Sequence, residues 1–273
     1  MSVILLFCSM NYIDINRKLW NERTKVHFGS AFYDNESFLQ GRNSLNSIEL
    51  DLLGDIAGKK ILHLQCHFGQ DTLSLARMGA NVTGVDLSDV AIEKARELSK
   101  STNLRAEFIC CDIYDLPNHL NKTFDIVFTS YGTIGWLPDI ERWAGIINRY
   151  LKPGGSFLLA EFHPVVWMFS YDFKSVEYGY FNTGSILETE KGSYTDGSEA
   201  LELESVSWNH TLSDVFTALK LNGISIKIFR EFDYSPYDCF QNTVETEPGK
   251  FMIRGLEGKL PMVYALKGVK SKT

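Results

Sequence analysis

The stretch from residue 59 to residue 86 constrains the fold of this chain more than any other. An apolar run at 61–64 leads into a short turn at 65–69, then apolar residues at helical spacing, then a second apolar run at 82–85 that ends on Asp86. Strand, turn, helix, strand and terminal acid in this order predict a βαβ unit that binds a nucleoside. Asp86 lies about 20 positions after the turn, where a carboxylate can accept hydrogen bonds from both ribose hydroxyls.

The composition of the turn narrows the choice of nucleoside. It reads Gln65-Cys66-His67-Phe68-Gly69 and holds a single glycine. A dinucleotide site uses G-x-G-x-x-G, because a pyrophosphate must approach the backbone closely. The sequence therefore favours a nucleoside derivative that carries no pyrophosphate.

Further strands and acids follow in an α/β pattern. The third strand is expected at 105–110, and Asp112 follows its end. A strand at 123–130 has the continuous apolar character of a buried parallel strand, and a helix begins at Asp139. The sequence Leu-Lys-Pro-Gly-Gly then makes a sharp turn into a strand at 156–161.

Together these motifs resemble the class I S-adenosylmethionine-dependent methyltransferase family. The resemblance rests on QCHFGQDTLS from Gln65 onward, on Asp86 and Asp112, and on FDIVF followed by LKPGG. The first of these motifs is similar to that of a group of bacterial small-molecule methyltransferases. The chain departs from the family pattern where His63 replaces an acid and where Gln65 and His67 replace two glycines.

The resemblance implies a three-layer Rossmann-like methyltransferase fold of the α/β class. Its sheet would be mostly parallel and seven-stranded with an antiparallel last strand, and would carry an N-terminal lid and a β-rich cap. Strands at 224–232 and 261–266 with only a loop between them should pair antiparallel, in agreement with that topology. The expected division is a lid at 1–58, a cofactor-binding core at 59–162, an antiparallel aromatic cap at 163–209, and the rest of the core at 210–273 with a substrate-side loop at 233–260.

The cofactor implied by the resemblance is S-adenosylmethionine, with S-adenosylhomocysteine as product. The resemblance assigns the ribose to Asp86, the adenine amino group to Asp112 and a ring nitrogen to the backbone amide of Ile113. Gln65 and His67 are expected to hydrogen-bond the methionine carboxylate. The expected cofactor-binding residues are Trp20, Arg23, Gln65, His67, Gly69, Asp86, Leu87, Asp112, Ile113 and Ser130.

The acceptor site is expected where aromatic residues gather. Between Phe162 and Trp208 they are denser than the chain average of 13%, on β-favouring segments at 175–180, 185–190 and 200–207. These residues would cover the strand tips, where open α/β sheets bind ligands, or would only bury the small core of the cap. Expected substrate-binding residues are His27, Tyr33, Tyr131, Trp136, Trp167 and Tyr237. Trp20 and Tyr33 have the alternative role of packing the lid onto the core.

Two residues are candidates for a general base. Glu161 and His163 stand where the fifth strand runs out into the expected pocket, and histidine can take a proton near neutral pH. In the alternative interpretation, His163 orders a His-Pro turn and Glu161 is structural. Methyl transfer by in-line displacement needs a base only if the acceptor must lose a proton.

Composition excludes several other classes of function. The net charge of -7 and the lack of a basic run beyond the C-terminal tail argue against nucleic-acid binding. An apolar run of six near the N-terminus is too short for a membrane helix and has the wrong flanks for a signal peptide. We expect no metal site, a cytoplasmic location with reduced thiols, and a monomer or homodimer. The cysteines, which form no C-x-x-C motif, are Cys8, Cys66, Cys110, Cys111 and Cys239.

Two other functions stay open from the sequence. A nicotinamide-dependent oxidoreductase would use the same βαβ unit but lacks its glycines, and binding of NADH without S-adenosylmethionine would establish it. A non-catalytic nucleoside sensor is favoured by the altered turn. Tight cofactor binding with no methyl acceptor in a broad metabolite screen would indicate the sensor.

Overall fold

The computed structural model describes residues 11–272, so the expectations for residues 1–9 lie outside the described part. Its main sheet contains β1 (Lys60–Leu64), β2 (Asn81–Asp86), β3 (Ala106–Cys110), β4 (Phe124–Ser130), β5 (Leu151–Phe162), β8 (Ile224–Phe232) and β11 (Val263–Lys270). The strand order is β3-β2-β1-β4-β5-β11-β8, and β11 runs antiparallel to both of its neighbours. The predicted seven-stranded sheet with a reversed last strand is confirmed.

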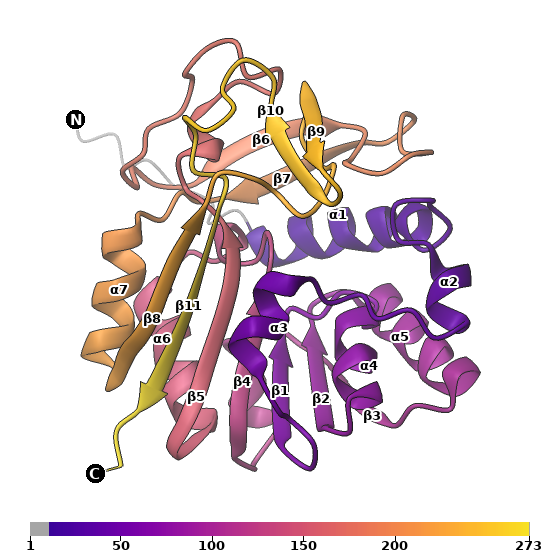
Figure 1. Cartoon of the computed structure of the whole chain (residues 1–273), viewed down its shortest axis with the longest axis vertical. Coiled ribbons are helices and arrows are strands. Elements are labelled where there is room, and N and C mark those ends of the chain that lie inside the picture. Colours follow the sequence, from indigo (N-terminus) through magenta and orange to yellow (C-terminus); the bar gives the residue numbers. More distant parts are fainter. Residues whose placement is uncertain (1–10, 273) are drawn as a thin grey trace, which may run out of the picture.

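Helices cover both faces of this sheet (Figure 1). They are α1 (Tyr12–His27), α2 (Asn35–Leu39), α3 (Ser47–Leu53), α4 (Gln70–Arg77), α5 (Asp89–Thr102), α6 (Ile140–Tyr150) and α7 (Leu212–Leu221), with short 3-10 turns at Leu116–Asn118, Ile134–Trp136 and Val166–Met168. α6 and α7 pack on one face through a core that includes Trp143 and Tyr264. α3 and α4 pack on the other, around Ile61 and Phe128. Because both faces are covered, β1, β2 and β4 are buried along most of their length instead of alternating between buried and exposed residues.

The helices begin at residues that suit a helix N-terminus. The Ser88 hydroxyl accepts the backbone N–H of Ala91 at 3.0 Å and caps α5. Asp139 caps α6 by accepting the N–H of Arg142 at 2.8 Å. Each cap satisfies a backbone donor that has no partner within the helix.

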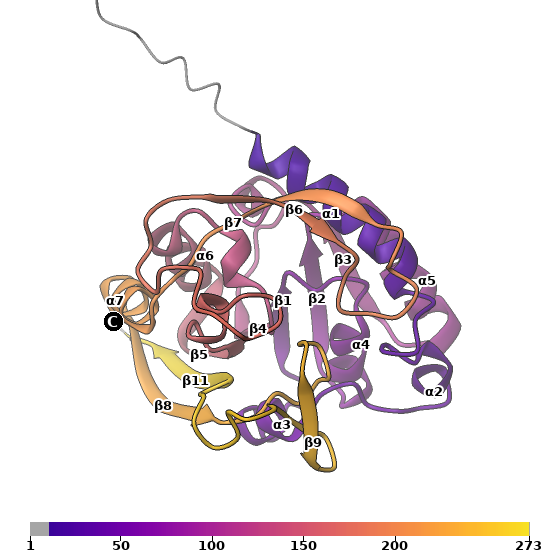
Figure 2. The same ribbon diagram turned by 90° about the horizontal axis from the view of Figure 1, so that it is seen from above.

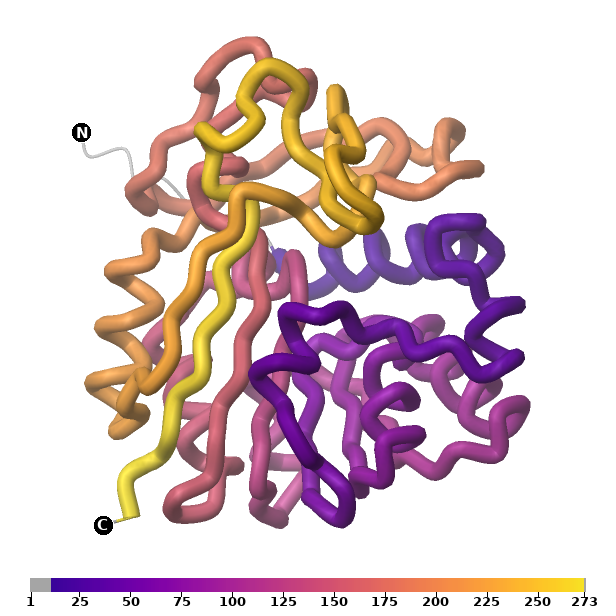
Figure 3. The backbone as a smooth tube through the Cα atoms, in the orientation of Figure 1, coloured from indigo at the N-terminus to yellow at the C-terminus, as the bar shows by residue number. Residues whose placement is uncertain are grey.

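Three parts of the chain differ from the expectation. The apolar residues from Tyr12 to Trp20 favour a helix and the aromatic-rich stretch at 20–34 favours an irregular segment, but α1 continues to His27. The expected strand at 175–180 is absent from the described structure, where Val176 forms only an isolated bridge with Phe169. The expected loop at 233–260 contains an antiparallel hairpin of β9 (Thr243–Glu247) and β10 (Lys250–Ile253), which lies above the strand ends in Figure 3.

α1 and the cap hairpin together form a roof over the carboxyl ends of the strands. The hairpin consists of β6 (Ile186–Lys191) and β7 (Glu202–Ser207), which pair antiparallel. Viewed from above, α1 and this hairpin lie side by side across the sheet (Figure 2). The buried Asn16 side chain donates to the carbonyl of Val206 at 2.8 Å and accepts its N–H at 2.9 Å. The lid is therefore joined to the cap by hydrogen bonds from one buried side chain of α1 to the main chain of β7.

No helix within residues 11–272 has both the length and the apolar character needed to cross a bilayer.

Candidate functional site

A cavity of about 1150 Å³ lies beneath the roof, at the carboxyl ends of β1, β2, β4 and β5. This is the edge at which open α/β sheets bind ligands, because the loops that follow parallel strands meet there. All ten expected cofactor-binding residues line this cavity. Of the expected substrate-binding residues, Tyr33, Tyr131, Trp136, Trp167 and Tyr237 line it.

The turn after β1 has three left-handed backbone positions, as a glycine-rich loop would have, but only one of them is a glycine. Gln65 has φ 55° and His67 has φ 49°, and Gly69 follows at φ 80°. Left-handed conformations disfavour residues that carry a Cβ atom, which is why glycine is common in such turns. The replacement of two glycines by Gln65 and His67 therefore changes side chains while keeping left-handed backbone conformations that glycine favours.

Asp86 at the tip of β2 is held in place by the backbone. One of its oxygens accepts the N–H of His67 at 2.7 Å and the other accepts the N–H of Ser88 at 2.9 Å. Burial raises the pKa of Asp86 to about 6, against the lowering effect of these donors. A carboxylate offers about four acceptor positions, so roughly two stay free for a pair of hydroxyl donors.

Asp112 lies one strand further along the same edge. One of its oxygens accepts the backbone N–H of Tyr114 at 2.6 Å, and its partial burial raises its pKa. Ile113, the next residue, is buried and also lines the cavity. Asp86 and Asp112 thus present two carboxylates on adjacent strand ends toward one space.

Arg23 enters the cavity from α1. Its guanidinium is buried, forms an ion pair with Glu190 of the cap, and lies 5.3 Å from the ring centre of Trp20 and 5.8 Å from that of Trp136. Among the described residues no group pairs with the buried Nε atom of Arg23 or with the buried Oε1 atom of Gln65. A polar ligand bound in the cavity can supply the hydrogen-bond partners that these two atoms lack.

His27 does not line the cavity, which corrects its expected role in substrate binding. The ring is fully buried, with its Nδ1 atom 3.2 Å from Nε2 of His67 and its Nε2 atom 2.9 Å from the hydroxyl of Ser193. Burial lowers the pKa of His27 to about 2 and that of His67 to about 3, so both rings are neutral at physiological pH. His27 instead connects the lid to the β1 turn and the cap.

Glu161 lines the cavity, but its carboxylate is fully occupied. It accepts the backbone N–H groups of Gly132, Thr133, Ile134 and Phe162 and the hydroxyl of Thr133, at 2.7 to 3.1 Å for the bonds of normal length. Five donors exceed the roughly four positions that a carboxylate offers. The expectation that Glu161 is a general base is therefore corrected: it fixes the loop that follows β4.

His163 turns away from the cavity that the described residues enclose. Its Nδ1 atom accepts the N–H of Val165 at 3.2 Å, so Nε2 carries the proton and donates to Glu231 at 3.1 Å. With both nitrogens engaged, His163 orders the turn after β5. This arrangement corresponds to the alternative interpretation of the sequence and corrects the expectation of a base at His163.

The sequence interpretation missed several residues that line the cavity. Tyr12 and Asn16 lie on the same face of α1 as Trp20 and Arg23, and their spacing along the helix could have revealed them. Phe32, after α1, was also missed and lines the cavity, as do Phe162, Tyr194 and Trp208 of the aromatic-rich stretch that the sequence indicated. These last residues lie on loops and strand ends, where side-chain periodicity gives no signal.

Known proteins share both the sequence pattern and the fold. A family model described as "Methyltransferase domain" matches residues 61–155. An uncharacterized methyltransferase of Synechocystis sp. is 32% identical over 161 residues, which cover 57% of this chain and 73% of that protein. Ubiquinone biosynthesis O-methyltransferase of Chromobacterium violaceum is 30% identical over 127 residues, which cover 45% of this chain and 54% of that enzyme. The match thus spans about half the length of the Chromobacterium enzyme.

A solved structure extends the likeness of fold beyond the matched segment. The S-adenosylmethionine-dependent methyltransferase of Clostridium acetobutylicum has a TM-score of 0.57 at 17% identity, and the comparison covers 94% of this chain and 98% of that chain. The lid and the core therefore belong to one fold that recurs in another protein.

Proposed function

Because the chain belongs to the class I S-adenosylmethionine-dependent methyltransferase family, we propose that it transfers a methyl group from S-adenosylmethionine to a small-molecule acceptor. The observation that carries this proposal is the set of polar groups at three neighbouring strand ends. The turn after β1, Asp86 after β2 and Asp112 after β3 all line one cavity. The cavity volume of about 1150 Å³ is larger than that of most single-ligand pockets, which measure about 300 to 1,000 Å³, so it supports the binding of both a cofactor and an acceptor.

The residues present fit the cofactor. In this proposal Asp86 holds the ribose hydroxyls, and Asp112 with the backbone of Ile113 holds the adenine. Arg23, whose Nε atom lacks a partner among the described residues, and Gln65 of the β1 turn line the same cavity and suit the amino-acid end of the cofactor. His67, Gly69, Leu87, Ser130 and Trp20 complete the enclosure.

When bound, S-adenosylmethionine supplies an activated methyl group, so the protein has mainly to align the acceptor and exclude water. The loop after β4 lines the cavity along residues 131–137. Glu161 holds this loop through three consecutive N–H groups, and the Gln65 side chain donates to the carbonyl of Thr133 at 2.8 Å. Alignment in this proposal depends on that loop.

The proposal has a direct test in calorimetric titration with S-adenosylmethionine, S-adenosylhomocysteine and NADH. We expect both sulfur nucleosides to bind in the micromolar range and NADH to bind far more weakly, because the β1 turn offers no glycine-lined approach for a pyrophosphate. Binding of NADH alone would establish the oxidoreductase instead. Tight binding of the sulfur nucleosides without turnover of any acceptor in a metabolite screen would favour a sensor.

A further inference from the structure

Part of the cavity is bounded by a connected set of aromatic rings, here called the aromatic wall. Its members are Phe32, Tyr131, Phe162, Trp167, Tyr237 and Phe240. Neighbouring rings have centroids 5.0 to 5.8 Å apart, in edge-to-face or tilted arrangements. These residues come from the lid, the ends of β4 and β5, the cap and the segment after β8. A wall of this kind favours a planar apolar ligand.

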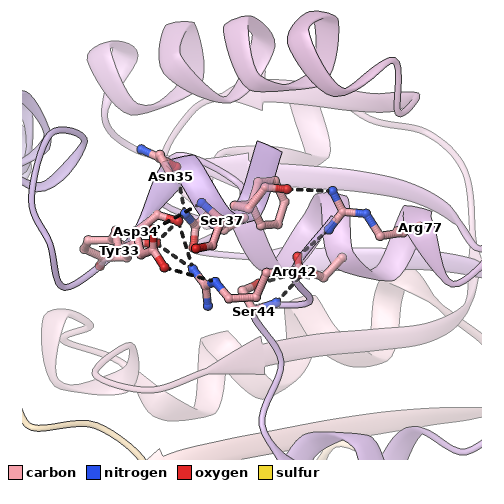
Figure 4. A network of polar contacts seen from close by, with 10 residues as sticks. Tyr33, Asp34, Asn35, Ser37, Arg42, Ser44 and Arg77 are labelled. Carbon is pink, nitrogen blue, oxygen red and sulfur yellow. Dashed lines mark hydrogen bonds and ion pairs between the residues drawn. The ribbon is translucent and has the colours of Figure 1, made fainter. Parts of the chain in front are cut away.

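The cations that line the cavity are already engaged. Arg23 pairs with Glu190. Arg42 donates to the backbone carbonyls of Tyr33 at 2.7 Å and Asp34 at 3.3 Å, as Figure 4 shows. The third, Lys191, has a largely exposed side chain that points to Glu202. Within the described residues, the cavity therefore offers no free cation to an anionic acceptor.

Two buried carboxylates lie beside the aromatic wall without a cation. Asp71 accepts the hydroxyls of Ser44 at 2.6 Å and Ser130 at 3.1 Å. Glu49 of α3, which is 1% exposed, accepts the hydroxyl of Tyr131 at 3.0 Å. In residues 11–272 no lysine or arginine lies within ion-pair distance of Glu49 or Asp71. Burial raises the pKa of Asp71 by more than its hydroxyl donors and the charge of Arg42 lower it, and Glu49 ionises at about pH 7. Above that pH the net charge of these two groups is negative, and an anion beside the wall would be repelled.

Tyr131 stands between the cavity and Glu49. Its ring belongs to the aromatic wall, whereas Glu49 does not line the cavity. Tyr131 has φ 37°, and Gly132 follows at φ 68°, in the loop that Glu161 holds. The Tyr131 oxygen donates its proton to Glu49 and keeps a lone pair with which it can accept a hydrogen bond. Burial, followed by the charge of Asp71, raises the pKa of Glu49 to about 7.

We propose that the acceptor is an uncharged aromatic molecule whose hydroxyl group donates a hydrogen bond to Tyr131, and that Glu49 takes up the proton released on methylation. This inference rests on the proposed function. As the acceptor oxygen gains the methyl group, the sulfur–methyl bond of S-adenosylmethionine would break and sulfur would keep the electron pair, leaving S-adenosylhomocysteine. The O–H bond of the acceptor breaks, and its proton passes to the Tyr131 oxygen. The proton of Tyr131 passes at the same time to Glu49, so Tyr131 ends neutral, Glu49 ends protonated, and the proton later leaves to solvent.

The test measures binding of two matched probes, 2-naphthol and 2-naphthoate, to the protein saturated with S-adenosylhomocysteine. Between about pH 5.5 and about pH 8.5 the first is neutral and the second anionic, because phenols ionise near pH 10 and carboxylic acids near pH 4. We expect naphthol to bind at least about tenfold more tightly than naphthoate at about pH 8, owing to the repulsion of the anion. Naphthoate binding that equals or exceeds naphthol binding, or no naphthol binding, overturns the inference.

Two variants separate the roles of the groups. Glu49→Gln keeps the shape and a side chain that suits the start of a helix, so α3 should form, and it should reduce the preference for naphthol at least about threefold. Tyr131→Phe should weaken naphthol about two- to tenfold and leave naphthoate unchanged. Asp51→Asn removes the same charge from an exposed position on the same helix and should change neither probe. Equal ratios in Glu49→Gln and the unmodified protein would contradict the proposal.

The pH dependence of the preference for naphthol distinguishes an ionising Glu49 from a residue with only a structural role. The preference for naphthol should increase as the pH rises through about 7 and Glu49 ionises, and Glu49→Gln should lose this dependence. The other ionisable groups that interact with Glu49 are Asp71 of α4, Tyr131 after β4, and Tyr234 and Tyr237 after β8. Failure to bind S-adenosylhomocysteine at all would count against the proposed function, whereas normal binding with no probe preference would count only against this inference.

Discussion

Two carboxylates of this cavity show how the surroundings of one residue decide its role. Asp86 accepts two backbone N–H groups and keeps acceptor positions toward the cavity. Glu161 accepts five donors and keeps none. Both are acids at a strand tip in the sequence, so their residue type and position alone could not separate a ligand-binding carboxylate from a structural one.

The contact that we propose between Asp86 and the ribose gives a prediction for affinity. Asp86→Ala should weaken binding of S-adenosylhomocysteine by about 1.5 to 3 kcal/mol, the usual range for a hydrogen bond to a charged partner. Calorimetric titration measures this change. Glu93→Gln, which removes an exposed acid from the helix that follows, should bind as the unmodified protein does. Unchanged affinity in Asp86→Ala would remove Asp86 from the cofactor site.

At the scale of elements, the sheet was predictable because its strands are buried on both faces and read as apolar runs. β1, β2, β4 and β8 lie within a residue or two of their expected positions. The hairpin of β9 and β10 was not predictable, because its residues are mostly half-buried or exposed and show no clear alternation. The end of α1 was missed because Arg23 and His27 are polar residues that face inward, opposite to the usual pattern.

The junction between α1 and β7 should stabilise the roof. Asn16→Ala would leave the N–H and the carbonyl of Val206 without their partners in a buried position, at a cost of about 1 to 3 kcal/mol per group. We expect lower stability in urea unfolding and faster amide hydrogen exchange at 202–207 and along α1. Faster exchange confined to the sheet strands would contradict this assignment. Asn11→Ala, at an exposed position before the same helix, is the control.

Close packing around β2 gives a second prediction at this scale. A Cβ atom on Gly84 would lie 2.9 Å from the sulfur of Cys66 and 3.0 Å from the ring of Phe108, both in the core. Gly84→Ala should therefore reduce the free energy of unfolding by about 1 to 3 kcal/mol. In Gly29→Ala the nearest atom would lie 3.9 Å away, so thermal unfolding of that variant should be nearly unchanged. Equal melting temperatures for both variants would refute the tight packing.

In the molecule as a whole, the histidines whose pKa values burial lowers outnumber the acids whose pKa values burial raises. Burial lowers the pKa values of His27, His63, His67, His163 and His210. As pH falls below about 6.5, the unfolded chain takes up protons at these positions at a higher pH than the folded chain does. Burial raises the pKa of Asp86 to about 6 and that of Glu49 to about 7, and it also raises the pKa values of Asp71 and Asp112, so these acids have the opposite effect. The folded state should lose stability as pH falls from about 6.5 toward 4.5.

Urea unfolding at about pH 7.5 and about pH 5 measures this dependence. His63, whose pKa burial lowers to about 3, is 2% exposed and bonds to the hydroxyl of Thr72 at 2.8 Å. Replacing His63 with glutamine should reduce the slope of stability against pH below about pH 6.5 by up to about 1.4 kcal/mol per pH unit, the value for one proton. His119→Gln changes an exposed histidine and serves as the control. A steeper slope in His63→Gln would show the sign to be wrong.

The union of α1 with β7 also has a consequence for synthesis of the chain on the ribosome. Asn16 and its partner Val206 are 190 residues apart, so α1 is made long before the strand that it recognises. At about 5 to 20 residues per second, α1 waits roughly 10 to 40 s for that strand. Arg23 likewise waits for its partner Glu190 of β6, and the cavity acquires its roof only after the hairpin of β6 and β7 has been made.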